Sequence, residues 1–557
     1  MKHSFKTIYF LLVLIFLHEH SLLAQKNDKP NFIFILTDDQ SYGMLGCEGN
    51  QIVKTPNIDQ LAKEGVQFTN AHITSAICTP SRVSILLSQY ERKHGVNFNS
   101  GTSLSEKAWN YSYPVLMKKA GYYTGWIGKN HAPVGNGGYR SGLMESSFDY
   151  WYAAHRHLSF YPKERHDIFS HAIKDTQVEV IEEGVMDFVD NENKLKGAVF
   201  FLKNRPKDQP FILSVCFNLP HDAGAGSMEL RESDDDIYKT MYRDVEIPLP
   251  ENYISKKEIK NPKLPTDLLL TENRQNGYDY VDTPEGVRER YIRQLQAMTG
   301  IDRMVGNLRK QLKKLHLEEN TVLIFTSDHG LFMGQFGLGG KALCYEITTH
   351  VPLIVYDPKN HLNNEGKVSD ELVQSIDLAP TMFDMANISI PQSFQGKSLY
   401  PLIKGKDQKV REFLFTENLW SNQFGNPRCE AVQNKEWKYI RYYRNNNLSL
   451  YKKTEVANLL GISVKKIQST VHDYDIVVYR DYIEASLQGE EPVYEELYNL
   501  KNDPSESNNL IKDEQYSIQL REMRQAWKEE IMFARGMGTP EVLRYTTESN
   551  NEFEVKK

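Results

Sequence analysis

The chain has 557 residues, of which 40% are hydrophobic and 11% aromatic, and its formal net charge is −7. This length is sufficient for a large buried core and for two or more structural units. The net negative charge argues against a general nucleic-acid or polyanion binder, which would need a strong basic excess, so any site for an anion must be local.

Residues 1–24 have the order of a secretory signal peptide. Lys2 and Lys6 precede an apolar run from Thr7 to Leu17, and small residues follow up to Ala24. The run is too short to span a bilayer, and no later segment approaches the required length. We therefore predict a protein without a membrane span that is exported to the periplasm or secreted.

Five short apolar runs with polar residues beside them predict the strands of a large sheet. The runs are residues 31–36, 123–127, 211–217, 321–325 and 351–355. Uninterrupted apolar runs of this length are typical of strands that are covered on both faces of a parallel sheet. Apolar residues at helical spacing from about Tyr291 to Leu315 predict a helix before the fourth run. This alternation predicts an α/β fold with a large, mostly parallel sheet flanked by helices.

Cys78 lies in front of a predicted helix. The apolar spacing of residues 83–90 is helical, and Pro80 occupies the favoured first turn. Backbone N–H groups, the helix dipole and Arg82 would then favour an anion or a charged nucleophile at Cys78. A buried structural cysteine is the alternative. The chain has five cysteines, too few for a disulfide framework, and their odd number leaves at least one unpaired.

Polar residues follow four of the five runs, and ligands of α/β sheets bind beyond the carboxyl ends of the strands. The fifth run is preceded by His350 instead. The residues after the four runs are Asp38, Asp39, Lys129, His131, His221, Asp328 and His329. The three carboxylates suit a hard cation such as calcium better than zinc, which would need more His or Cys ligands. Alternatively, paired aspartates at strand ends cap a turn or a helix.

Six short segments, in chain order, resemble the type I, formylglycine-dependent sulfatases of the alkaline phosphatase superfamily. They are Asp38-Asp39, Cys78-Thr79-Pro80-Ser81-Arg82, Gly128-Lys129-Asn130-His131, Leu219-Pro220-His221, Ser327-Asp328-His329-Gly330 and Gly339-Gly340-Lys341. A later stretch from Glu496 to Leu510 is also similar to the family, so the resemblance extends from about Asn31 to Leu510.

The resemblance implies a mechanism. A maturation enzyme would oxidise Cys78 to formylglycine (3-oxoalanine), and the hydrated aldehyde would attack the sulfate ester. One calcium ion would be held by Asp38, Asp39, Cys78, Asp328 and His329. The remaining catalytic residues implied are Arg82, Lys129, His131, His221 and Lys341. Among these, His221 or Lys341 would protonate the leaving alcohol, and His131 would accept the diol proton in the second step.

Beyond about residue 405 the pattern changes. Residues 411–416 and 437–443 predict antiparallel strands, and residues 514–535 predict an amphipathic helix. We therefore predict a catalytic domain over residues 25–405 and a smaller α+β domain with an antiparallel sheet over residues 406–557. Residues 224–286 are predicted to form a loop excursion. The aromatic residues at 148–152, followed by His155, Arg156 and His157, form either a sugar-stacking platform or part of the core.

Together these observations predict an exported sulfatase that hydrolyses sulfate monoesters. The expected substrate is O-sulfate on a polysaccharide or its oligosaccharides, whereas an N-sulfate or a small aryl sulfate is an open alternative. Two other functions are also considered. One is a phosphate or phosphonate ester hydrolase of the same superfamily, and the other is a non-catalytic binder of sulfated glycans.

Overall fold

An eight-stranded sheet lies at the centre of the protein. The computed structural model describes residues 29–98, 102–154, 197–221, 239–265, 268, 278–360, 366–419, 426–443, 483–538 and 542–544. In spatial order the strands are β12 (Lys367–Ser369), β2 (Val66–Phe68), β11 (Leu353–Tyr356), β8 (Thr321–Ser327), β1 (Asn31–Asp38), β7 (Phe211–Pro220), β5 (Tyr123–Lys129) and β6 (Tyr150–Ala154). Strands β8 to β6 pair in parallel, and β12 is parallel to β2, whereas β11 is antiparallel to both of its neighbours. The predicted mostly parallel α/β sheet is therefore confirmed.

Both faces of this sheet are buried, which explains the uninterrupted apolar runs. Along β1, Phe32, Phe34 and Leu36 pack into one hydrophobic cluster, while Ile33 and Ile35 pack into another on the opposite face. Successive side chains of a strand point to opposite faces, so a strand between two helical layers needs apolar residues at every position.

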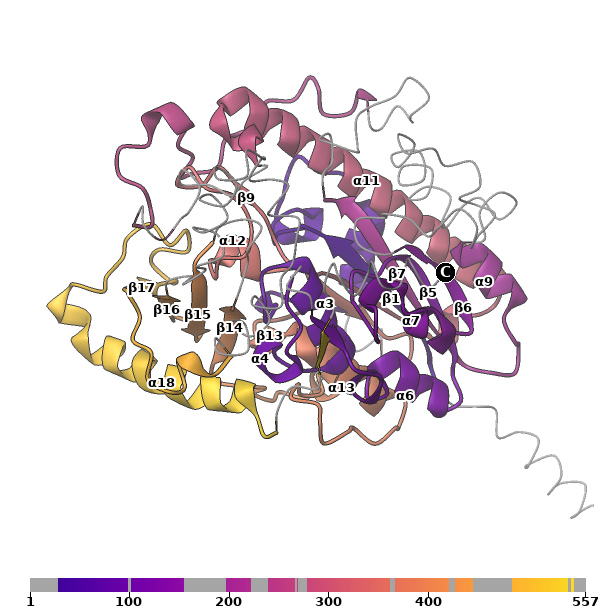
Figure 1. Ribbon diagram of the computed structural model, residues 1–557. Helices are drawn as coiled ribbons and strands as arrows, with labels where there is room; N and C mark the ends of the chain where they lie inside the picture. Colours follow the sequence, from indigo (N-terminus) through magenta and orange to yellow (C-terminus); the bar gives the residue numbers. More distant parts are fainter. Residues whose placement is uncertain are drawn as a thin grey trace, which may run out of the picture.

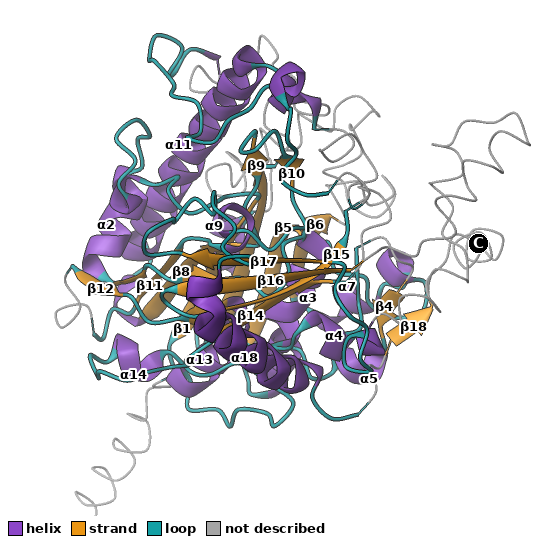
Figure 2. Cartoon of the chain, turned by 90° about the vertical axis from the view of Figure 1, so that its left-hand side faces the viewer, coloured by secondary structure: helices purple, strands orange, loops and turns teal. Residues whose placement is uncertain are grey.

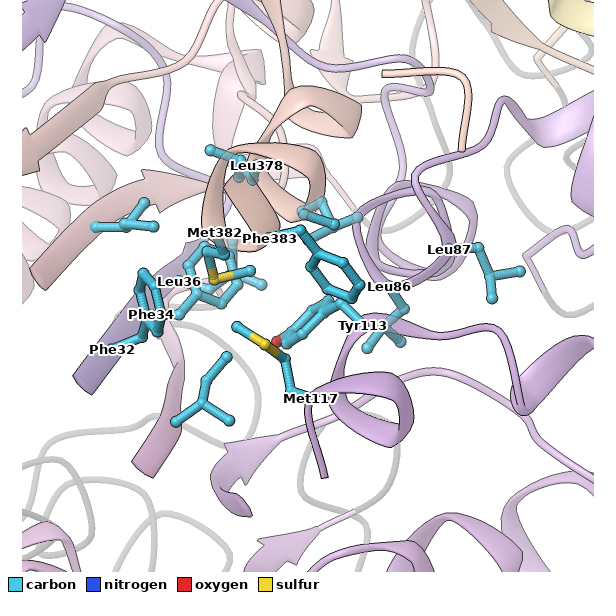
Figure 3. Close-up of a cluster of buried hydrophobic side chains, with 14 of the residues drawn as sticks. Phe32, Phe34, Leu36, Leu86, Leu87, Tyr113, Met117, Leu378, Met382 and Phe383 are labelled. Atoms are coloured by element: carbon cyan, nitrogen blue, oxygen red, sulfur yellow. The ribbon is translucent and has the colours of Figure 1, made fainter. Parts of the chain in front are cut away.

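Helices cover the sheet on both sides (Figures 1 and 2). One layer contains α3 (Cys78–Leu87), α6 (Tyr113–Lys119) and α13 (Leu378–Met385), whose side chains meet those of β1 in the cluster shown in Figure 3. The other contains α2 (Pro56–Glu64), α9 (Ala198–Asn204) and α11 (Pro284–Lys314). The predicted helix at 291–315 is α11, which begins earlier because the Thr283 side chain accepts a hydrogen bond from the Gly286 N–H. Among the described residues, no helix is both long enough and apolar enough to cross a bilayer.

Shorter elements connect these layers. The short helices are α4 (Glu91–His94), α5 (Glu106–Trp109), α7 (Leu143–Ser147), α12 (Glu346–Thr349) and α14 (Tyr400–Ile403). Three small strand pairs are β3 (Ala71–His72) with β13 (Val373–Gln374), β4 (Thr102–Leu104) with β18 (Val542–Arg544), and β9 (Phe332–Met333) with β10 (Gly339–Gly340). The described part of 224–286 includes short 3₁₀ turns at Lys256–Glu258 and Asp279–Asp282 and the start of α11.

A second, antiparallel sheet follows the first, as predicted. Its strands, in order, are β14 (Leu414–Asn418), β15 (Arg428–Gln433), β16 (Trp437–Tyr443) and β17 (Tyr494–Asn499), and α18 (Ser517–Arg535) packs on it. Strand β14 begins three residues later than expected. Arg411 lies outside it because its guanidinium makes two 2.6 Å hydrogen bonds to the Asp377 carboxylate.

The aromatic residues at 148–152 belong largely to the core rather than to a sugar platform. Phe148 packs against Trp126 and Trp151 on one face of the sheet, and Tyr152 lies in the cluster on the other face. The alternation of β6 therefore directs these rings into the interior. The predicted signal peptide and His155, Arg156 and His157 lie outside the described residues.

Arg92 of α4 connects the large sheet region with the second sheet. This fully buried side chain donates to Glu417 of β14 and Glu430 of β15, at 2.6 Å each, and to the Ile483 carbonyl at 2.9 Å. Trp527 of α18 donates to the other oxygen of Glu430 at 3.0 Å. One buried cation thus pairs with two carboxylates that come from neighbouring strands.

Arg92→Met should lower the free energy of unfolding by about 3–5 kcal/mol, because it leaves two buried carboxylates without their countercharge. Urea unfolding would measure the loss. The matched control is Lys409→Met, since Lys409 and its partner Glu412 are 65% and 68% exposed and such pairs contribute less than about 1 kcal/mol. Equal losses in the two variants would contradict the role given to Arg92.

Candidate active site

Neighbouring strand ends bring the predicted polar residues to one edge of the large sheet. Asp38 ends β1 and Asp39 follows it; Asp328 follows β8, and its N–H donates to the Thr37 carbonyl at 3.1 Å. Lys129 ends β5, and His221 directly follows β7. These four strands are adjacent in the order β8, β1, β7, β5, and all five side chains are buried.

Cys78 is the first residue of α3 and lies among these strand ends. Its Sγ is 3.6 Å from Asp38 Oδ1, 3.1 Å from His329 Nε2 and 3.2 Å from Lys341 Nζ. The whole helix is buried, Cys78 being 0% exposed. A thiol at the positive end of a helix, next to a histidine and a lysine, occupies a position that stabilises a charged nucleophile.

Helix α3 is shorter at its end than the sequence predicts. It stops at Leu87 because Ser88 adopts a left-handed conformation with φ of 52°. The Ser88 hydroxyl donates to the Ile376 carbonyl at 2.6 Å, which holds this turn in place. Gln89 and Tyr90 therefore lie beyond the helix, although their spacing fits its apolar face.

Arg82, one turn into α3, links three strand ends. Its Nε donates to Asp328 Oδ2 at 2.7 Å, one terminal nitrogen to Asp38 Oδ2 at 3.2 Å, and the other to the Lys129 carbonyl at 3.0 Å. The side chain is only 1% exposed. Arg82 therefore fixes the relative positions of β1, β5 and β8 as well as balancing their charge.

The two lysines pair with the two adjacent aspartates. Lys129 Nζ contacts Asp38 Oδ2, and Lys341 Nζ lies 2.8 Å from Asp39 Oδ1. Burial by itself would raise the pKa of Asp38, but Lys129 and the other nearby positive groups outweigh it and hold that pKa well below its usual value. The pKa of Asp39 is lowered against burial in the same way, chiefly by Lys341. Both carboxylates are consequently charged at neutral pH.

Histidines surround this pair. His329 Nδ1 lies 3.3 Å from Asp39 Oδ1, and its Nε2 lies 3.6 Å from Asp328 Oδ1. Burial opposes protonation of His329, but the nearby Asp328 carboxylate chiefly outweighs that effect and raises the pKa of His329 to about 9. His221 Nε2 lies 3.7 Å from Asp39 Oδ2. His131 is buried two residues after Lys129, where its ring packs edge-on to Phe98 with centroids 5.5 Å apart.

The donor set fits a hard metal ion. Ligand atoms of Asp38, Cys78, Asp328 and His329 lie within 4.8 Å of one another, and so do those of Asp38, Asp39, Cys78 and His221. Within the described part of the chain, Asp39 Oδ2 is buried and accepts no hydrogen bond, with His221 Nε2 3.7 Å away; a buried charged oxygen is costly unless a cation or a similar group is close. Three carboxylates favour an ion that prefers oxygen ligands.

His350, the polar residue before the fifth run, lies outside this group. Its ring stacks on Tyr42 at 4.1 Å and on His72 at 4.7 Å, beside Glu346. The planes of the two imidazoles are only 12° apart, and a nitrogen of each ring faces Glu346 Oε2, His72 Nε2 at 3.1 Å and His350 Nδ1 at 3.6 Å. The ligand atoms of these three residues lie within 4.8 Å of one another and form a second group, separate from the one at Cys78.

Two residues that support the site were not singled out from the sequence. Ser81 Oγ donates to the Asp328 carbonyl at 2.5 Å, and Asn426 Nδ2 donates to the Lys341 carbonyl at 2.7 Å. Ser81 lies inside the Cys78 segment, where its place one turn after Cys78 and directly before Arg82 is a usable signal. Asn426 precedes β15 and reaches the site only through the packing of the second sheet, so no local pattern could reveal it.

Comparison with known families identifies the chain in two steps. A family model described as Sulfatase matches residues 30–388, and one described as N-sulphoglucosamine sulphohydrolase, C-terminal, matches residues 334–473. Together with the fold, these matches define a hydrolase of the alkaline phosphatase superfamily. Within that superfamily, the chain belongs to the sulfatase family.

Individual relatives agree with this assignment. An arylsulfatase of Clostridium perfringens is 28% identical over 440 residues, which cover 74% of this chain and 85% of the relative. An N-acetylglucosamine-6-O-sulfatase of Bacteroides thetaiotaomicron is 24% identical over 549 residues, covering 91% and 87%. The solved structure of BT4656 in complex with D-glucosamine-2-N,6-O-disulfate is similar in fold, with a TM-score of 0.63, 20% identity and coverage of 92% and 99%.

Gly128, which precedes Lys129, is required by the close approach of β5 to β7. Its φ is +89°, and a Cβ at this position would lie 2.0 Å from the carbonyl oxygen of its paired residue Cys216. Gly121 provides a matched control, because its φ is +94° but a Cβ there would meet nothing within 4 Å.

Gly128→Ala should destabilise the protein by roughly 3 kcal/mol or more, whereas Gly121→Ala should cost only about 1–2 kcal/mol from the left-handed backbone. Comparing the free energies of chemical unfolding of the two variants would separate the cost of the left-handed backbone from the cost of the clash with Cys216. Similar losses would show that the contact with Cys216 relaxes without cost.

Proposed function

We propose that this sulfatase is exported and hydrolyses O-sulfate esters of a polysaccharide or its oligosaccharides, with formylglycine made from Cys78 as its nucleophile. The observation that carries the proposal is the position of Cys78, whose Sγ lies within 3.6 Å of Asp38, His329 and Lys341 at a buried helix start. Export rests on the signal-peptide pattern of residues 1–24. We assign residues 25–405 to the catalytic domain and 406–557 to the smaller domain.

Two relatives support a sulfated sugar as the substrate. The N-acetylglucosamine-6-O-sulfatase matches 91% of this chain, and the fold is shared with a protein solved in complex with a disulfated glucosamine. Because one relative is an arylsulfatase, small aryl sulfates are also useful test substrates.

The charges of the site suit an anionic ester. A sulfate monoester is already negative, so a nucleophile approaches it against repulsion, and Lys129, Lys341 and Arg82 spread the developing charge. The hydrated aldehyde supplies one hydroxyl that attacks sulfur and a second whose deprotonation releases sulfate. Calcium, held by Asp38, Asp39, Asp328 and the side chains at 78 and 329, would lower the pKa of the attacking hydroxyl.

Proton transfers fall to the residues around Cys78. His221 and Lys341 both contact Asp39 and are the candidates to protonate the leaving alcohol, and His131 is the candidate base for the second step. Because the thiol and all of α3 are buried, we infer that the maturation enzyme acts on this segment before it folds.

Cys78→Ala should reduce sulfate release by at least about 10³-fold while leaving the unfolding transition in place, because it removes the nucleophile but little core volume. Sulfate release would be measured with sulfated glucosamine and with an aryl sulfate. Cys47→Ala, which alters a half-buried thiol outside the site, should retain the wild-type rate.

The same preparations discriminate the alternatives. Peptide mapping of active wild-type protein should find an aldehyde at position 78, and an intact thiol in fully active enzyme would refute the mechanism. Paired sulfate and phosphate esters should show faster sulfate release; preferred phosphate release would indicate a phosphate or phosphonate hydrolase. Binding of a sulfated glycan without any release would indicate a non-catalytic binder.

Calcium should stabilise the chelator-treated protein by about 2.7 kcal/mol when present at roughly 100 times its Kd. The gain should appear as a rise in Tm and disappear in Asp39→Asn, which removes a carboxylate of the proposed ligand set. Asp370→Asn, a change at a residue 73% exposed, should preserve the gain. No response to calcium, or an undiminished response in Asp39→Asn, would exclude these ligands.

A further inference from the structure

Two thiols that play no part in the proposed reaction face each other between the large sheet region and the second sheet. Cys344 lies in the turn between β10 and α12, and Cys429 is the second residue of β15. Their Sγ atoms are 3.4 Å apart, and both residues are 0% exposed. A disulfide bond is about 2.0 Å long, so an approach of about 1.4 Å would join them.

The described residues make only weak contacts with these two sulfurs. The Cys344 thiol points to the Thr416 carbonyl at 3.8 Å, and the Cys429 thiol to the Ala342 carbonyl at 3.9 Å. Both contacts are long and thiols are weak donors, so little is lost if the sulfurs turn toward each other. Around them lies a hydrophobic cluster that includes Tyr345, Tyr442 and Tyr498.

We propose that Cys344 and Cys429 form a disulfide bond in the exported protein. The two thiols give up two protons and two electrons; a disulfide-donating oxidoreductase, or a small disulfide such as oxidised glutathione, takes both electrons and is released as its dithiol or two thiols. One thiolate attacks the donor disulfide, and the second then displaces the donor from the mixed disulfide. Since both sulfurs are buried after folding, the exchange takes place while the chain folds.

The bond would secure the segment that carries Lys341. Lys341 precedes Cys344 by three residues, and Asn426, which donates to the Lys341 carbonyl, precedes Cys429 by three residues. The disulfide and this hydrogen bond would therefore fasten the same two segments side by side. The inference rests on the proposed export, because a reducing compartment would keep the thiols free, but it does not rest on catalysis.

The test is thiol mapping of the full chain, produced in a bacterial host once with a leader that directs export and once without a leader in the reducing cytoplasm. Each preparation is denatured, alkylated before any reduction, digested and analysed by mass spectrometry. In the exported protein we expect the peptides of Cys344 and Cys429 to be joined and to resist alkylation until reduced. Cys47 and Cys216 should be alkylated in both preparations, and all four thiols in the cytoplasmic one.

Alkylation of all four thiols in the exported protein, or a bond between a different pair, would overturn the proposal whatever the activity of the preparation. A second measurement is independent of mapping. Exported wild-type protein should melt roughly 5 °C higher than its cytoplasmic, reduced counterpart, because the bond closes a long loop. This difference should vanish in Cys429→Ala and persist in Cys47→Ala; its persistence in Cys429→Ala would also contradict the bond.

Discussion

The contact on which the site depends is that of the Arg82 guanidinium with Asp38, Asp328 and the Lys129 carbonyl. Three parallel strands end at this point, and each presents a buried carboxylate or carbonyl oxygen that accepts a hydrogen bond from Arg82. Removal of this buried cation would leave two buried carboxylates without their shared partner, which is strongly destabilising. Two more cations lie beside this group, because Lys129 contacts Asp38 and Lys341 pairs with the adjacent Asp39. The charges required by the chemistry are therefore also the charges that hold the strand ends together.

Much of this arrangement follows from the sequence, because both faces of the large sheet are buried and the strands are consequently apolar throughout. The same physics places residues such as Asp38 and Asp328, which follow those strands, at one edge. Boundaries were less predictable where a single contact decides them: Ser88 ends α3 through its bond to Ile376, and Arg411 lies outside β14 because it pairs with Asp377. The aromatic residues of β6 were ambiguous, since a core strand and an exposed platform have the same composition.

The second sheet contributes to the site as well as to stability, and this part could not be predicted from local patterns. Asn426 reaches the Lys341 carbonyl from just before β15, while Glu417 and Glu430 of the same sheet pair with Arg92 of α4. Such contacts join residues that are far apart in sequence and carry no periodic signal. They become visible only when the packing of the two sheets is known.

The single antiparallel strand in the core of the large sheet, β11, has a topological consequence. Strand β8 ends at the edge where Cys78 lies, and β11, its antiparallel neighbour, starts at that edge. A parallel neighbour would require the connection to cross back to the opposite edge of the sheet. Residues 328–352, which connect β8 to β11, do not have to do so because the two strands are antiparallel. This connection can stay at the edge where Cys78 lies, and it carries Asp328 and His329 at its beginning and Lys341 further along. Because β11 is antiparallel to β8, a long connection at one edge of the sheet joins the two strands in place of a crossover helix.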